Sequence, residues 1–362
     1  YYELAAKQGN ATALLNFGTM YSQGNGVERN YEKAIEYYKK SAKLQNSFAY
    51  LCLGDLYENG KGVTQDYLKA KKYYEISSRM NNSYALLSLG QLYEKGLGVK
   101  QNYFTALQYY TLSSKLNNSE AFFYLATLYS TVIPSEPDIP KTIQLLNKCI
   151  ETYSEKWIDS DSSHYIQEKF VYRSKNDLGL IYLTFYNDID KATNFLKEAA
   201  FNEFPFAQNN FGLLNQFYLN NVDNAKYMYQ KASKNGFYLA EYNLGYLMEK
   251  DDKMIDALDH YIKASDNEDQ PLIFHNFEHV DLRLETSKTF IICMTNLKIC
   301  YFYLSQPNKA EAARKYFIRS FSKIISDKDK FMFHFNIINN KPFLDSLKNT
   351  EIIMTNKILS LT

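Results

Sequence analysis

Apolar and small residues recur along this chain at intervals of three and four, which is the spacing of one face of an α-helix. A first stripe consists of Ala49, Leu53, Leu56 and Tyr57. A second stripe consists of Ala70, Tyr73, Tyr74 and Ser77 or Ser78. Glycines lie between the two stripes, and glycine commonly ends a helix and turns the chain back. The pattern therefore predicts two antiparallel helices joined by a short loop.

The whole unit repeats every 36 residues. Equivalent positions are Gly18, Gly54 and Gly90; Tyr21, Tyr57 and Tyr93; Gly26, Gly62 and Gly98; Ala34, Ala70 and Ala106; and the tyrosine pairs at 37–38, 73–74 and 109–110. One helix hairpin cannot bury both of its apolar faces, so neighbouring hairpins must stack on it. Self-similarity at this period predicts an all-α fold, a right-handed α-solenoid of stacked antiparallel helix hairpins.

The same frame continues, with changes, along the chain. Ala126 takes the glycine position of a fourth repeat, and the pairs Leu178-Gly179, Phe211-Gly212 and Leu244-Gly245 then recur 33 residues apart without the glycine loop. The expected organisation is regular repeats over 1–150, an extension over 151–172, degenerate shorter repeats over 173–265, an insertion over 266–288, a weak repeat over 289–326 and a C-terminal cap over 327–362. Tyr1 and Tyr2 stand 36 residues before the pair at 37–38, so the first repeat is truncated and we expect the natural protein to begin further upstream.

Residues 49–78 resemble the Sel-one-like repeat family, a relative of the tetratricopeptide repeat with longer loops. Its pattern is A-x3-LG-x2-Y-x2-G-x-GV, followed by a KA pair, an aromatic pair and a small-residue pair, and these residues match it nearly throughout. The later repeats fit the shorter tetratricopeptide pattern better. The resemblance implies a non-enzymatic scaffold or adaptor that brings other proteins together, in signalling, or in ER-associated degradation beside a membrane ubiquitin ligase.

The same resemblance implies where partners bind, because tetratricopeptide groove positions transfer through the shared Leu-Gly frame. These positions are Phe48, Leu51, Asp55 and Glu58, then Tyr84, Leu87, Gln91 and Glu94, then Glu120, Phe123 and Thr127. Core packing is the alternative role for Leu51, Leu87 and Phe123. The carboxylates at these positions predict an acidic groove over 47–130, in which Lys95 is a positive charge. We therefore expect a partner segment with lysine or arginine beside an apolar anchor. The competing expectation places binding in the extension around Trp157 or in residues 266–287.

The loop Gly60-Lys61-Gly62-Val63-Thr64 raises the question of phosphate binding. A phosphate loop needs four residues between its first glycine and a Gly-Lys pair, with Ser or Thr directly after the lysine. This loop lacks that spacing, and its lysine position holds Asn25 and Leu97 in the other copies. We therefore expect the loop glycines to serve an unusual backbone conformation, and no nucleotide to bind.

Residues 275–279, HNFEH, fit the H-x-x-E-H pattern of inverted zinc proteases. On a helix, His275 and His279 would share one face, and Glu278 could activate a water molecule. A third ligand would have to come from a distant acid such as Glu311, and no motif surrounds it. A zinc hydrolase is therefore the remote alternative, and we expect no cofactor, metal or catalytic residue.

Length, charge and hydropathy limit the classes of partner and the cellular compartments that we expect. A chain of 362 residues exceeds the usual size of a single compact core, which favours several domains or a repeat array. Its 41 basic and 40 acidic residues leave a net charge of +1, which provides no overall attraction for nucleic acid or anionic membranes. No apolar run is long enough to span a membrane. A cytoplasmic location is expected, with the ER lumen or an ER membrane association as the alternative, in which case sequons at Asn10, Asn81 and Asn117 could carry glycans.

Overall fold

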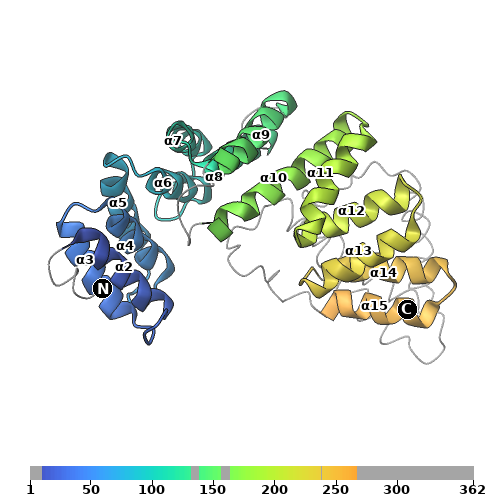
Figure 1. The fold of residues 1–362 in the computed structure, drawn as a ribbon, viewed down its shortest axis with the longest axis horizontal. Helices are drawn as coiled ribbons and strands as arrows, with labels where there is room; N and C mark the ends of the chain where they lie inside the picture. Colours follow the sequence, from blue (N-terminus) through green and yellow to red (C-terminus); the bar gives the residue numbers. More distant parts are fainter. Residues whose placement is uncertain (1–9, 132–137, 156–163, 238, 267–362) are drawn as a thin grey trace, which may run out of the picture. The chain divides into compact units, whose positions relative to one another are not determined.

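The computed structural model describes residues 10–131, 138–155, 164–237 and 239–266, and every regular element in these ranges is an α-helix (Figure 1). The chain divides into two compact units, Tyr1–Asn187 and Asp188–Thr362. The first unit contains α2 (Ala11–Gln23), α3 (Tyr31–Lys43), α4 (Ser47–Asn59), α5 (Tyr67–Arg79), α6 (Ser83–Lys95), α7 (Tyr103–Lys115), α8 (Ser119–Thr131), α9 (Ile139–Glu155) and α10 (His164–Phe185). The second contains α11 (Ile189–Phe201), α12 (Pro205–Phe217), α13 (Val222–Lys234), α14 (Leu239–Lys250) and α15 (Met254–Asp266).

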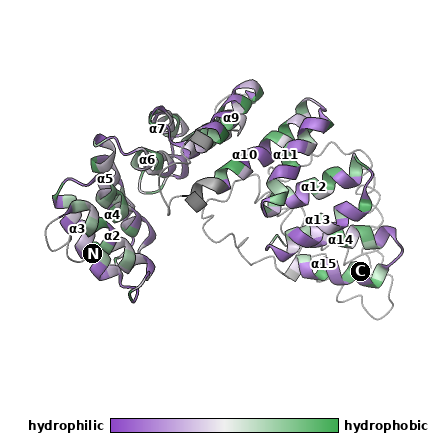
Figure 2. Ribbon diagram, in the orientation of Figure 1, coloured by the Kyte–Doolittle hydropathy of each residue, from purple (hydrophilic) through white to green (hydrophobic). Residues whose placement is uncertain are grey.

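Within each unit, every helix packs on the helix before it and the helix after it. The hairpins α2–α3, α4–α5, α6–α7 and α8–α9 follow one another in the first unit, and α12–α13 and α14–α15 in the second. Helices α3, α5 and α7 also pack on the first helix of the next hairpin. Hydrophobic and hydrophilic residues alternate along the same helices in Figure 2, as expected for helices with one buried face. The predicted all-α solenoid of stacked hairpins is thereby confirmed.

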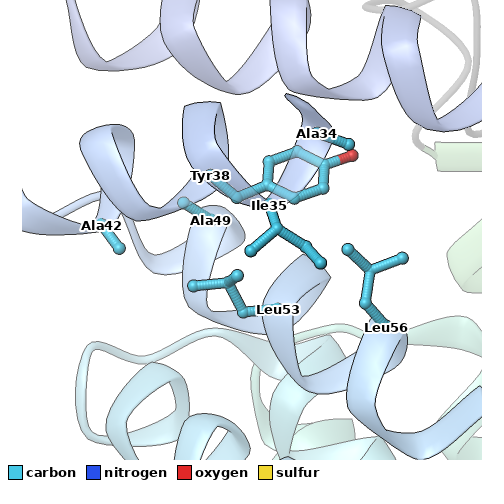
Figure 3. Close-up of a cluster of buried hydrophobic side chains, with 7 residues drawn as sticks. All are labelled: Ala34, Ile35, Tyr38, Ala42, Ala49, Leu53 and Leu56. Atoms are coloured by element: carbon cyan, nitrogen blue, oxygen red, sulfur yellow. The ribbon is translucent and has the colours of Figure 1, made fainter. Parts of the chain in front are cut away.

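The core runs between hairpins as well as inside them. Ala34, Ile35, Tyr38 and Ala42 of α3 meet Ala49, Leu53 and Leu56 of α4 in one buried cluster (Figure 3). Leu53 is 1% exposed, and burying a side chain of that size contributes about 1.5–3 kcal/mol. Because this cluster joins two successive repeats, each hairpin depends on its neighbour for stability.

The first helices of the first three hairpins begin and end in the same way. Asn10, Asn46 and Asn82 accept hydrogen bonds from first-turn amides of α2, α4 and α6. Each helix then ends at a glycine in the left-handed conformation, for example Gly60 with φ of 64°. The second loop glycine, Gly62, has φ of 72°, and Lys61 between them is exposed. The expectation that the glycine loop serves backbone conformation is confirmed.

The expected extension over 151–172 is helical where it is described. Helix α9 continues to Glu155, and α10 begins at His164, well before the Leu178–Gly179 pair that marks the next repeat. Helix α10 packs on α8 and α9. All but the first residue of the expected insertion over 266–288, the weak repeat over 289–326 and the cap over 327–362 lie outside the described residues.

Candidate protein-interaction surface

The second tyrosine of each aromatic pair lies against the glycine of its hairpin's first helix. A Cβ atom on Gly54 would lie 2.4 Å from Cε1 of Tyr74, and one on Gly90 would lie 2.4 Å from Cε1 of Tyr110. The glycine is therefore required because its bare backbone gives the tyrosine ring its place, and both rings are fully buried. The same contact recurs in the second unit between Gly212 and Tyr229, and between Gly245 and Tyr261.

This contact brings the tyrosine hydroxyl to the residue four positions after the glycine. The hydroxyl of Tyr74 donates to Glu58 Oε2 at 2.6 Å and to Asp55 Oδ1 at 2.7 Å. The tyrosine hydroxyls at the same place in other repeats bond to Ser22, Glu94, Gln216 and Glu249. Serine, glutamate and glutamine thus share one structural role. The sequence carried a signal for it, a polar residue four positions after five of the repeat glycines, Gly18, Gly54, Gly90, Gly212 and Gly245, which the transfer of groove positions did not use.

The pKa of Asp55 is raised although the Tyr74 hydroxyl bonds to its carboxylate. Burial raises the pKa of Asp55 to about 7, and the nearby Glu58 charge adds to the rise, while the Tyr74 hydrogen bond and Lys61 oppose it. One hydroxyl proton cannot satisfy two carboxylates fully. A protonated Asp55 supplies the missing proton, so the surface carries less negative charge near neutral pH than the sequence suggests.

The predicted partner-binding positions fall into three groups. Phe48 and Lys95 are exposed. Leu51, Asp55, Glu58, Tyr84, Gln91, Glu94 and Thr127 are partly buried. Leu87, Glu120 and Phe123 are buried, which assigns Leu87 and Phe123 to the core, the alternative role that their spacing allowed. Glu58 and Glu94 each accept a hydrogen bond from a tyrosine hydroxyl of their own hairpin.

Helix α10 lies against Phe123 and Tyr124 of α8. The ring of Phe170 in α10 lies 5.5 Å from that of Phe123 and 5.8 Å from that of Tyr124. The guanidinium carbon of Arg173 lies 4.5 Å from the centre of the Phe123 ring, a cation–π contact. The chain itself therefore covers the expected groove at α8, and the positions on α4 and α6 remain.

On α4 and α6, an aromatic pair and a row of polar groups share one side of the helices. The rings of Phe48 and Tyr84 lie 6.4 Å apart and join the two helices. Asp55 and Glu58 follow Phe48 at intervals of seven and ten residues, so they continue the same helical stripe. At a rise of 1.5 Å per residue, the stripe from residue 48 to residue 58 is about 15 Å long.

Cys52 and Cys149 are unpaired, and burial raises the pKa of both thiols to about 12, which makes thiolate chemistry unfavourable. Across the described ranges, no three His, Cys, Asp or Glu side chains are placed to hold a metal ion together. The HNFEH segment at 275–279 lies outside those ranges. Among the helices that the structure describes, none combines the length and the apolar character needed to cross a membrane.

The fold and this surface define the chain as a helical-repeat protein. The model of the Sel1 repeat matches residues 1–10, 11–46, 47–82, 83–118, 207–237 and 239–269. The chain belongs to the Sel1 repeat family, as its sequence pattern indicated, and proteins of this family generally mediate protein–protein interactions.

Two solved structures share the fold. The first is c5321, a protective antigen of uropathogenic Escherichia coli with an SLR fold, at 24% identity and a TM-score of 0.62. The match covers 91% of this chain but only 64% of c5321, so the chain spans less than two thirds of that protein. The second is a Sel1 repeat protein from Oxalobacter formigenes, at 24% identity and a TM-score of 0.53, covering 62% of this chain and 88% of the other. No curated protein sequence matches the chain.

Proposed function

We propose that the chain is a non-enzymatic scaffold that binds an extended segment of a partner protein along α4 and α6. The segment places an apolar side chain against Phe48 and Tyr84 and a lysine or arginine toward Glu58 and Glu94. Extended chain spans about 3.3 Å per residue, so about five residues cover the stripe of about 15 Å.

The contact of α10 with α8 is the observation that carries this proposal. There the chain lays an aromatic ring, Phe170, and a basic group, Arg173, against Phe123 and Tyr124. Arg173 also stands six residues before its repeat glycine, as Phe48, Tyr84 and Glu120 do before theirs or before the alanine that replaces it. An aromatic anchor beside a basic group is the chemistry that the sequence predicted for a partner segment, here supplied within the chain.

The test is selection from a random peptide library displayed against the purified full chain. We expect enriched peptides to carry lysine or arginine within about five residues of an aromatic or aliphatic side chain. Their affinity falls about tenfold with Phe48→Ala and also with the double variant Glu58→Gln and Glu94→Gln, and rising salt weakens them. Glutamine is the conservative choice because Gln216 already accepts a tyrosine hydroxyl bond, at 2.7 Å from Tyr229.

The matched control is the double variant Glu32→Gln and Glu36→Gln, which removes two exposed carboxylates from α3 instead. This control keeps full affinity. Peptides that bind the Phe48 and glutamate variants as well as the original chain would place recognition elsewhere and contradict the proposal.

A further inference from the structure

The outer faces of α5 and α7 carry large apolar side chains in water. Leu68 and Ile76 of α5 are 60% and 39% exposed, and Phe104 and Leu112 of α7 are 67% and 47% exposed. Leu68 and Phe104 are equivalent in the 36-residue repeat, as are Ile76 and Leu112. Leu68 and Ile76 are eight residues apart along α5, and Phe104 and Leu112 are eight residues apart along α7. Eight residues of helix are about 12 Å long. We call these four residues the outer apolar face.

No other described second helix is apolar at both of these positions. The equivalent pairs are Glu32 and Lys40 in α3, Pro140 and Lys148 in α9, Asp190 and Glu198 in α11, Asp223 and Lys231 in α13, and Ile255 and Lys263 in α15. Position in the repeat therefore does not demand an apolar residue, since five of seven helices place a charged residue at one or both positions. Exposed apolar side chains gathered on two neighbouring elements indicate an interaction site.

Helices α5 and α7 lie next to each other on this side of the array. Both pack on α6. A Cβ atom on Gly98, in the loop that leads into α7, would lie 2.6 Å from Cβ of Tyr67 at the start of α5. Burial raises the pKa of Tyr109 in α7, and the charges of Glu75 and Lys71 in α5 also act on it. The outer apolar face therefore belongs to two helices that approach each other.

The charge around this patch is basic. Helices α5 and α7 together hold Lys69, Lys71, Lys72, Arg79 and Lys115 against one acidic residue, Glu75. Glu75 is paired with Lys71 at 3.0 Å, so it does not offset the other four. Lys72 lies between Leu68 and Ile76 on the same stripe and is exposed. Since the whole chain has a net charge of only +1, this excess is local.

We infer that the outer apolar face binds an acidic amphipathic helix of a partner protein, at a site separate from the proposed surface on α4 and α6. Anchors about 12 Å apart match apolar residues at i, i+4 and i+7 or i+8 of a helix lying along the two-helix surface. Glutamate or aspartate on the flanks of that helix meets Lys69, Lys72, Arg79 and Lys115. A basic partner is repelled by the same four side chains.

The probe is a synthetic amphipathic peptide of about 18 residues with leucine on one face and glutamate on the other. The control peptide has the same leucines, with lysine in place of every glutamate. Both are titrated onto the full chain and followed by fluorescence anisotropy. We expect the glutamate peptide to bind with an affinity that falls as salt rises. The lysine peptide is expected to bind at least about tenfold more weakly.

Variants at exposed positions locate the binding without disturbing the fold, which circular dichroism checks. Phe104→Ser and Lys72→Glu each weaken the glutamate peptide about tenfold, whereas Lys39→Glu, the same charge change on α3, leaves it unchanged. Phe48→Ala also leaves it unchanged, which separates this site from the surface on α4 and α6. Equal binding of both peptides, or no effect of Phe104→Ser, would overturn the inference.

Two further experiments distinguish an acidic helix from two other occupants of the outer apolar face, a second copy of the chain and a lipid surface. Sedimentation velocity that shows a dimer of the full chain, abolished by Phe104→Ser, identifies a second copy as the occupant and overturns the inference. Vesicles containing phosphatidylserine that capture the chain through Phe104 and Lys72, with no binding of the glutamate peptide, identify a lipid surface and overturn it as well.

Discussion

The ring of Tyr74 lies on the backbone of Gly54 so closely that a methyl group on the glycine would fall 2.4 Å from Cε1 of the tyrosine. Tyr74 is fully buried there. The glycine of the repeat thus has a packing role in the middle of a helix, where glycine is otherwise about 1 kcal/mol less favourable than alanine.

Gly54→Ala is therefore expected to destabilise the protein, despite the higher helix propensity of alanine. Forcing a methyl group against a buried ring costs about 1–3 kcal/mol. The measurement is the urea midpoint followed by far-UV circular dichroism. The chain contains the compensating pair, because its fourth repeat has Ala126 at the glycine position and Leu146 at the tyrosine position, both buried.

The control for this effect is Gly54→Ala in a Tyr74→Leu background. There the methyl group meets a smaller side chain, so the substitution is expected to cost at least about 1 kcal/mol less than in the original chain. Equal costs in the two backgrounds would show that the contact with the Tyr74 ring is not the reason for the glycine.

Gly62→Ala is expected to destabilise the protein more than Gly26→Ala, although both glycines have φ of 72°. A Cβ atom on Gly62 would lie 2.3 Å from Cβ of Tyr31 in the preceding hairpin, whereas the nearest atom to one on Gly26 is Cε of Met20 at 3.8 Å. The shared cost of the left-handed conformation is about 1 kcal/mol, and the clash adds about 1–3 kcal/mol at Gly62 alone. Thermal unfolding of the two variants measures the difference.

Two further variants test the same loop. Gly62→Val is expected to destabilise by at least about 1 kcal/mol, while Lys61→Ala is expected to leave stability almost unchanged, because Lys61 is exposed. A loss of ATP binding in the Lys61→Ala chain would contradict a purely structural loop.

Asp55 is expected to make the protein less stable as pH rises through about 7. Its pKa is about 7 in the folded chain and about 4 when unfolded, so between these values the folded state holds the extra proton. The contribution to stability is complete below pH about 4 and is lost as pH rises through about 7. Asp55→Asn, which mimics the protonated acid, should gain about 1 kcal/mol or more relative to the original chain between pH about 5 and 8.

The next repeat supplies a natural precedent for that variant, because Gln91 occupies the equivalent position. Urea midpoints over the pH series measure the effect. A pH-independent difference between Asp55→Asn and the original chain would mean that Asp55 is charged throughout. Glu58, Lys61 and Tyr74 act on the same carboxyl, so the series is run without other substitutions.

Glu241 in the second unit is expected to show the opposite dependence. Burial works to raise its pKa, but hydrogen bonds from His260, at 2.6 Å, and Ser233 lower it below the usual value of 4.5. Its contribution to stability is therefore present above pH about 4.5 and is lost as pH falls through the lower folded-state pKa. Glu241→Gln should cost about 1–2 kcal/mol at pH about 7 and little at pH about 3. The control is Asp259→Asn, which removes an exposed carboxylate from α15 and should leave the free energy of unfolding unchanged at both pH values.

The sequence by itself determined the helices, the repeat register and the loops. These follow from local rules, namely apolar spacing and glycine at the end of a helix, so an unusual backbone conformation could be expected at the loop glycines without a structure, and Gly60 and Gly62 both have positive φ. The family followed from the same positions.

Only the tertiary structure decided which side chains on the first helices are open to a partner. Phe48, Tyr84 and Glu120 are equivalent in the repeat, yet Phe48 is 48% exposed and Glu120 is 8% exposed, and of their three helices only α8 has α10 packed on it. Helical spacing places a residue on a face but does not say which neighbouring helix reaches that face. The tyrosine hydroxyl bonds to Asp55 and Glu58 join residues 19 and 16 positions apart, and they form only because the bare backbone of Gly54 lets the ring of Tyr74 approach.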